Sequence, residues 1–197
     1  MNPQSAPPLV LASTSTFRRQ LLSRLLLPFV VANPEVDETP LPAEPPPATA
    51  ERLARRKAEA VAAQFPGSLI IGSDQVAYCG ASVYGKPGTR ERARAQLAAM
   101  RGRTVVFHTA VCLLDAASGR SQCQGVPTEV VFRDYSAAEI ERYLDREDAL
   151  NCAGSAKSEG LGITLIEALR GDDPNALIGL PLIALARMLR AEGVQLP

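Results

Sequence analysis

Asp74 is the carboxylate of this sequence whose position best suits chemistry. It follows the apolar residues 69–71 and two small residues, Gly72 and Ser73. Such a run is typical of a buried strand, so we expect Asp74 at the strand's end, where open α/β sheets bind ligands. A carboxylate there can accept a proton from water or bind a cation. The alternative is an aspartate that only caps a turn.

Three cations are predicted near the same region. Arg18 shares the apolar stripe of a predicted helix with the leucines that follow it, and Lys57 lies on the inward stripe of a helix predicted over residues 48–64. Lys86 lies in a predicted tight turn. A buried cation requires an anion, and phosphate is one candidate. For Lys57 the alternative is an aliphatic stem packed inward with its ammonium group in water.

The hydroxyl-rich residues 13–16 join a predicted strand, residues 9–12, to the helix that carries Arg18. A strand, a small polar turn and a helix N-terminus together bind phosphate, because unpaired N–H groups and the helix dipole both face the turn. Ser13 and Ser15 are therefore candidate phosphate ligands. The alternative is an ordinary helix cap.

An acidic segment, residues 33–40, follows a second predicted strand at residues 29–32 and includes Glu38. Carboxylates beside a phosphate loop suggest Mg²⁺, which takes one or two protein carboxylates together with substrate oxygens. Solvated acidic loops are also common, so this segment alone decides little. The proline-rich residues 41–47 are predicted to be extended or mobile.

The sequence argues against a P-loop and against a histidine-based catalytic or metal site. Residues 80–86 match the pattern G-x-x-x-x-G-K, but Pro87 replaces the Ser or Thr that a P-loop uses to bind Mg²⁺, so we reject that interpretation. His108 is the only histidine and lies in an apolar, strand-like run, which favours a structural role.

Composition narrows the class of protein. Lys and Arg together number 21, as do Asp and Glu, so the formal charge is zero, which argues against binding nucleic acid or membrane surfaces. The four cysteines form no C-x-x-C pair, and we expect free thiols in a reducing compartment. Residues 1–8 lack signal-peptide features and are predicted to be a disordered lead into a cytoplasmic protein.

No repeat or long linker appears, so the pattern of helices and strands predicts one compact domain over residues 1–197. We predict a structural role for two features. They are a long hairpin over residues 105–114 and 124–132 and a capping box at Ser136 and Glu139. The Gly-rich residues 152–162 suit a loop that approaches a ligand. A strand at residues 163–169 and a terminal helix beginning near residue 180 complete the prediction.

With these pieces in place, the chain resembles the Maf family of nucleoside triphosphate pyrophosphatases over nearly its whole length. Several spaced motifs match in order, which is more specific than any one of them. They are Leu11-Ala12-Ser13-Thr14-Ser15, Val36-Asp37-Glu38, Arg56-Lys57-Ala58, Gly72-Ser73-Asp74-Gln75-Val76, Gly85-Lys86-Pro87 and Gly179-Leu180-Pro181. Gln75 and residues 157–162 are most similar to the branch named YceF, which is associated with 7-methyl-GTP.

The resemblance implies a mixed α/β fold: an elongated mixed sheet flanked by helices, with two lobes around a central cleft as in inosine-triphosphate pyrophosphatase, and often a homodimer. It implies hydrolysis between the α- and β-phosphates of a nucleotide. The implied catalytic residues are Asp74 as proton acceptor, Glu38 and Lys57, with Glu38 and Asp74 also holding Mg²⁺ or, alternatively, Mn²⁺ or Co²⁺. The implied triphosphate ligands are Ser13, Ser15, Arg18 and Lys86, and the implied base-selecting residues are Phe17, Gln75 and Glu159.

Two alternatives stay open at this stage. The first is a dTTP or UTP pyrophosphatase of the same family. The second is a nucleotide-binding regulator of cell division or septum formation with little hydrolysis, for which residues 40–47 would be a docking segment.

Overall fold

Residues 7–197 are described by a computed structural model, so most of the predicted lead at residues 1–8 lies outside the described part. The described residues form a seven-stranded sheet with the order β2-β1-β3-β5-β6-β7, and β4 pairs with β3. The strands are β1 (Leu9–Ala12), β2 (Phe29–Ala32), β3 (Leu69–Cys79), β4 (Ser82–Tyr84), β5 (Thr104–Asp115), β6 (Ser121–Phe132) and β7 (Ile166–Arg170). The α-helices are α1 (Thr16–Ser23), α2 (Pro46–Val61), α3 (Arg90–Met100), α4 (Ala137–Leu144) and α5 (Leu182–Ala191). The predicted mixed α/β class is confirmed.

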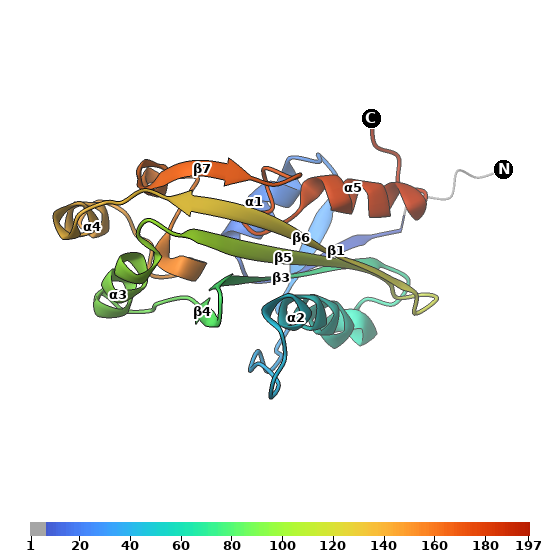
Figure 1. The fold of residues 1–197 in the computed structure, drawn as a ribbon. Coiled ribbons are helices and arrows are strands. Elements are labelled where there is room, and N and C mark those ends of the chain that lie inside the picture. The colour runs from blue at the N-terminus through green and yellow to red at the C-terminus, as the bar shows by residue number, and fades with distance from the viewer. Residues whose placement is uncertain (1–6) are drawn as a thin grey trace.

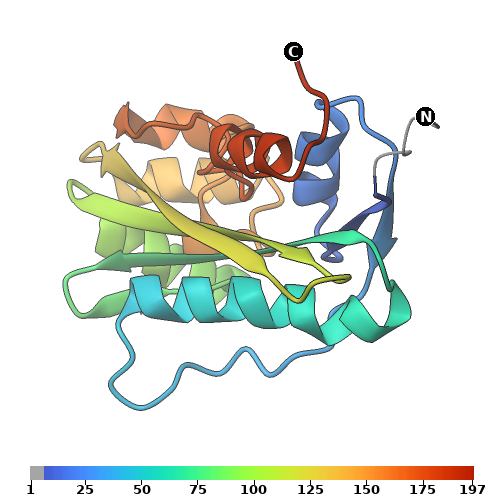
Figure 2. The same ribbon diagram turned by 90° about the vertical axis from the view of Figure 1, so that its right-hand side faces the viewer.

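Three long strands, β3, β5 and β6, run through the molecule and connect its two ends (Figure 1). β1 pairs in parallel with β2 and β3, whereas the other pairs are antiparallel. Helix α2 covers one face of the sheet, and α1 and α5 lie on the opposite face (Figure 2). The sheet therefore separates the side chains of α2 from those of α5.

Two hydrophobic cores occupy the two ends of these strands. One core joins α1 and α5 to the first half of β3, with Leu21, Ile71 and Leu185 almost fully buried. The other joins α3 and α4 to the opposite end of the sheet, with Phe107 and Tyr135 buried. Two packed ends with a middle region between them match the expected lobes around a cleft.

The sheet has an opening beside the middle of β3. β1 ends at Ala12, which is paired with Gly72, and β4 begins to pair only at Ala77. Residues 73–76 are therefore paired with β5 on one edge, and neither β1 nor β4 covers the other edge. The prediction that β3 ends near Asp74 is wrong: β3 continues to Cys79 because the long strand β5 pairs with it through residue 78. The opening arises from the end of the short strand β1 instead.

Gly72 allows α2 to lie directly against β3 at this opening. A Cβ atom at Gly72 would lie 2.0 Å from the carbonyl oxygen of Ala54 and 2.8 Å from the backbone nitrogen of Ala58. These are helix backbone atoms, so the contact cannot be relieved by a rotamer change.

We expect Gly72→Ala to destabilise the fold by about 3 kcal/mol or more, because α2 must move away from the sheet. The thermal midpoint should fall by at least about 6 °C. Gly85→Ala is the matched control, since a Cβ atom there meets nothing within 4 Å and the residue does not have a positive φ. Equal midpoints for the two variants in a thermal unfolding experiment would contradict this account.

Three other predictions are corrected. Helix α2 begins at Pro46, earlier than predicted, because proline is favoured in the first helical turn, so residues 46 and 47 are not a free extended segment. Residues 161–165 form a 3₁₀ helix, and the predicted strand begins only at Ile166. Cys112 and Cys123 face each other across β5 and β6 and form a disulfide, so free thiols were wrongly predicted for this pair.

No helix in the described part combines the length and apolar character needed to cross a membrane.

Candidate active site

A cavity of about 730 Å³ opens where β1 ends and β3 continues. This volume lies in the range that accommodates nucleotide-sized ligands. Its lining includes all ten of the residues predicted from the sequence to form the site, namely Ser13, Ser15, Phe17, Arg18, Glu38, Lys57, Asp74, Gln75, Lys86 and Glu159. Residues from the turn after β1, α1, the acidic segment, α2, β3 and the 152–162 loop thus converge on one space.

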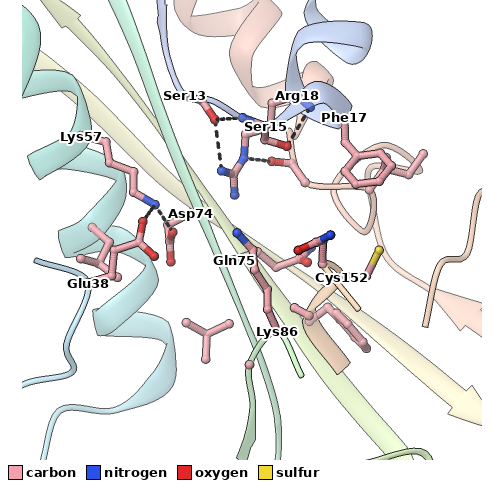
Figure 3. Close-up of a pocket in the computed structure, with 18 of the residues that line it drawn as sticks. Ser13, Ser15, Phe17, Arg18, Glu38, Lys57, Asp74, Gln75, Lys86 and Cys152 are labelled. Carbon is pink, nitrogen blue, oxygen red and sulfur yellow. Dashed lines mark hydrogen bonds and ion pairs between the residues drawn. The ribbon is translucent and has the colours of Figure 1, made fainter. Parts of the chain in front are cut away.

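Lys57 is the centre of a charged cluster on the α2 side of the sheet. Its ammonium group lies 2.6 Å from Asp74 Oδ1 and 2.6 Å from Glu38 Oε1 (Figure 3). The Lys57 side chain is 7% exposed, so the interpretation that its ammonium group reaches bulk water is wrong. Burial opposes ionisation of Glu38, but the hydrogen bond to Lys57 and the charges of Lys57, Lys86 and Arg18 outweigh it and lower the pKa of Glu38. The cluster therefore holds Glu38 as a carboxylate.

Two further cations in the cavity have no carboxylate bound to them within residues 7–197. Arg18 donates from Nε to the Gly179 carbonyl at 2.8 Å and from Nη1 to Ser13 Oγ at 3.4 Å. Burial lowers the pKa of Arg18, while the charges of Asp74 and Glu38 oppose that shift. Lys86 is exposed and forms no ion pair among the described residues. Both positive charges are thus available to an anion entering the cavity.

The N-terminus of α1 faces the cavity, as the strand, turn and helix pattern predicted. Ser15 caps the helix by accepting from the Arg18 backbone, and its own N–H donates to Ser13 Oγ. The expectation that the N–H groups of residues 13–15 are free is therefore only partly right. Within residues 7–197, the backbone N–H groups without a protein acceptor here are those of Thr14, Thr16 and Phe17. These donors lie where a helix N-terminus attracts phosphate.

Gln75 points to the other face of β3 from Asp74, because side chains alternate along a strand. Its amide nitrogen donates to Thr109 Oγ1 at 2.8 Å and to the carbonyl oxygens of Ala176 and Leu177 at 3.1 and 2.9 Å. Both residues still reach the same cavity, since the uncovered edge of β3 lies between its two faces. In Figure 3 the Lys57 cluster lies on one side of the space, Phe17 and Cys152 on the other, and Gln75 between them.

A clamp on the acidic segment was not predicted. Arg52 donates to Glu44 from Nε at 2.6 Å and from Nη2 at 2.8 Å, and Nη2 also donates to the Thr39 carbonyl at 3.2 Å. The hydrogen bonds from Arg52 lower the pKa of Glu44 from 4.5 to about 2. Thr39 follows Glu38 directly, so this clamp positions the backbone that carries Glu38. The spacing of charges along a helix does not predict the ion pair between Arg52 and Glu44, because Glu44 lies before the start of α2.

No activated nucleophile lines the cavity among the described residues. Cys152 is a lining residue, but burial raises the pKa of its thiol to about 11, so it is a neutral thiol at physiological pH. His108 is buried on β5, with Nε2 3.5 Å from Glu51 Oε1, and it is not a lining residue. The prediction of a structural histidine agrees with this position.

The carboxylates of Glu38 and Asp74 fit a divalent cation only in part. Each uses one oxygen for Lys57, and the second oxygen, Glu38 Oε2 or Asp74 Oδ2, has no hydrogen-bond partner within residues 7–197. The described residues contain no group of three or more His, Cys, Asp or Glu side chains able to hold a metal. Two hard oxygen ligands without a complete cage suit Mg²⁺, which keeps waters and takes substrate phosphate oxygens as further ligands.

The structure is that of an α/β protein with a cavity lined by cations and a helix N-terminus, and comparison with known proteins gives its family. The family model described as Maf-like protein matches residues 8–192. The chain therefore belongs to the Maf-like family. A protein named 7-methyl-GTP pyrophosphatase from Aromatoleum aromaticum is 62% identical over 189 residues, which cover 96% of this chain and 97% of that protein.

Two other relatives with the same name are also similar over nearly the whole chain. The one from Xanthomonas oryzae pv. oryzae is 59% identical over 97% of this chain and 100% of its own length. The one from Cupriavidus metallidurans is 56% identical over 98% of this chain and 97% of its own length. The similarity thus includes every segment that lines the cavity.

Proposed function

We propose that this protein is a nucleoside triphosphate pyrophosphatase that hydrolyses 7-methyl-GTP to 7-methyl-GMP and pyrophosphate. The observation that carries the proposal is the cluster of the buried Lys57 and Asp74 with the exposed Glu38. It lies in one cavity with a helix N-terminus and with two cations that form no ion pair within residues 7–197. Relatives named for this activity, 56–62% identical over nearly the whole chain, supply the substrate.

The triphosphate is held by charge and by backbone donors. Arg18 and Lys86 supply positive charge without a competing carboxylate, and the free N–H groups at the start of α1 supply directed hydrogen bonds. The hydroxyl groups of Ser13 and Ser15 lie in the same turn and can donate to phosphate oxygens. In the proposed complex these groups would hold the triphosphate in the same cavity as the Lys57 cluster.

Glu38 and Asp74 would hold the divalent cation, Mg²⁺ or alternatively Mn²⁺ or Co²⁺, together with phosphate oxygens. Such an ion, when bound, neutralises charge on the phosphates and favours the departure of pyrophosphate. The proton of the attacking water goes to Asp74, whose Oδ1 is kept in place by Lys57. Water attacks phosphorus directly, since no activated serine or cysteine lines the cavity within residues 7–197.

The base is selected at the other end of the cavity. Phe17 stacks on the purine ring, and the attraction is stronger for a ring made cationic by methylation. Glu159 and Gln75 accept hydrogen bonds from the N1–H and amino groups of guanine. A homodimer, the absence of nucleic-acid and membrane partners, and a cytoplasmic location stay predictions.

The proposal is tested by comparing kcat/KM for 7-methyl-GTP, GTP, dTTP and UTP with Mg²⁺. We expect 7-methyl-GTP to be the best substrate. A higher kcat/KM for UTP than for 7-methyl-GTP would contradict the base assignment, and tight nucleotide binding without turnover under any divalent cation would favour the regulatory alternative.

We expect Arg52→Ala to lower kcat/KM about 10- to 100-fold, because a displacement of about 1 Å in a catalytic group has effects of this size. In limited proteolysis, the same variant should be cleaved faster than the wild-type protein within residues 37–44. Arg55→Ala is the control, since this arginine lies on the exposed face of α2 and has no ion pair in the described part. Normal kcat/KM for Arg52→Ala would contradict a positioning role for the clamp.

A further inference from the structure

Thr109 belongs to a buried hydrogen-bond network beneath the cavity. It lies on β5 opposite Gln75, and its side chain is fully buried. Its hydroxyl donates to the Ala176 carbonyl at 2.8 Å and accepts from Gln75 Nε2 at 2.8 Å. A hydroxyl has a single hydrogen, and this one goes to Ala176, so toward Gln75 it is an acceptor.

The network fixes which end of the Gln75 amide faces inward. Gln75 Nε2 has two hydrogens and lies within hydrogen-bond distance of three acceptors, Thr109 Oγ1 and the carbonyl oxygens of Ala176 and Leu177. Turning the amide over would place its oxygen against these three oxygens. Within residues 7–197, Gln75 Oε1 has no hydrogen-bond partner, and it is not among the buried atoms left without one. It is therefore the polar atom of Gln75 that a ligand can reach.

The segment that carries these carbonyl oxygens is also held at its end, at Gly179. Ser73 Oγ lies 2.8 Å from the Ala110 carbonyl oxygen and 3.0 Å from the Gly179 carbonyl oxygen, so its single hydrogen goes to one of them or is shared between them. Arg18 Nε donates to the same Gly179 oxygen at 2.8 Å. Residues 176–179 are thus tied to β3, β5 and α1. The orientation of the Gln75 amide is consequently a property of the folded scaffold before any ligand binds.

We propose that Thr109 is a positioning residue that helps to present the oxygen of the Gln75 amide, and not its nitrogen, to a ligand. The cavity then selects a base that offers hydrogen-bond donors. This inference rests on the function proposed above. Guanine presents two adjacent donor groups, N1–H and the 2-amino group. Uracil and thymine present one N–H between two carbonyl acceptors. The cavity holds a locked Gln75 oxygen and the Glu159 carboxylate, two acceptors that match the first pattern and repel the carbonyls of the second.

The test measures KM and kcat for 7-methyl-GTP and UTP in Thr109→Val and Thr109→Ser. In Thr109→Val the Gln75 amide loses one of its three acceptors and keeps the carbonyls of Ala176 and Leu177, so the preference for the orientation with its oxygen toward the cavity is weakened. We expect KM for 7-methyl-GTP to rise about tenfold with kcat within about twofold, and the preference for 7-methyl-GTP over UTP to fall about tenfold. Thr109→Ser keeps the hydroxyl and should retain the wild-type preference.

Thr128→Val is the matched control, because the buried Thr128 hydroxyl on β6 has no hydrogen-bond partner in the described part of the chain. It should leave the preference unchanged. The inference is overturned if Thr109→Val lowers kcat for both nucleotides equally with KM unchanged, or if Thr109→Ser is as impaired as Thr109→Val. Failure of the proposed function is distinct from these outcomes, since it appears as absent turnover in the wild-type protein.

Discussion

Asp74→Asn should lower kcat for 7-methyl-GTP by about 10²- to 10⁴-fold, the usual contribution of a general base. Asparagine has nearly the same shape as aspartate, and its Oδ1 can still accept from the Lys57 ammonium group, which lies 2.6 Å from Asp74 Oδ1. The side chains and N–H groups proposed to hold the triphosphate lie on α1, in the turn before it and in the turn that carries Lys86. Nucleotide affinity, measured by isothermal titration calorimetry, should therefore stay within a few-fold of the wild-type value.

Asp37→Asn provides the control for this variant. Asp37 lies on the same acidic segment as Glu38 but is not a lining residue, and its Oδ1 accepts from the Thr39 backbone, which an asparagine can also do. Turnover should be near normal. If Asp74→Asn instead kept kcat within a few-fold of wild type, Asp74 would not be the proton acceptor.

Lys57→Met should affect stability and catalysis together. Asp74 is 11% exposed, and the substitution removes its buried positive partner. Breaking one side of a buried ion pair costs about 3 to 5 kcal/mol, so the free energy of unfolding should fall by about this amount. Burial already opposes ionisation of Glu38, and without Lys57 nothing equally close offsets it, so the pKa of Glu38 should rise.

The change in pKa gives this variant a distinctive pH dependence. In the wild-type protein burial is outweighed, chiefly by the hydrogen bond and charge of Lys57, and the pKa of Glu38 is lowered from its usual value, so Glu38 is a carboxylate at neutral pH. In Lys57→Met the acid limb of the kcat profile should move to higher pH. Arg55→Met removes a positive charge from the exposed face of the same helix and should move neither the acid limb nor the free energy of unfolding. An unshifted acid limb in Lys57→Met would contradict the role given to the cluster.

The parts of the site that could be predicted are those with a local signal. Arg18 and Lys57 lie at positions where helical periodicity requires an apolar residue, and a cation there indicates a partner. The structure supplies that partner for Lys57, in Asp74 and Glu38, and leaves Arg18 without a carboxylate. The turn before α1 was likewise predictable, because a strand, four hydroxyl residues and a helix follow one another directly.

The parts that could not be predicted depend on contacts between distant segments. The strand containing Asp74 continues to Cys79 because β5 pairs with it, and the opening in the sheet follows from the end of β1. The clamp between Arg52 and Glu44 and the network around Gln75 join residues that no periodicity relates. Pairing of Cys112 with Cys123 required the register of β5 on β6, which the hairpin pattern predicts only to within a few residues.

Identification of the products formed from 7-methyl-GTP by the wild-type protein tests the central claim most directly. The reaction, run with Mg²⁺ and followed by ³¹P NMR, should yield pyrophosphate and 7-methyl-GMP in equal amounts from the start, and Asp74→Asn should yield neither at a comparable rate. Release of orthophosphate and 7-methyl-GDP would contradict cleavage between the α- and β-phosphates.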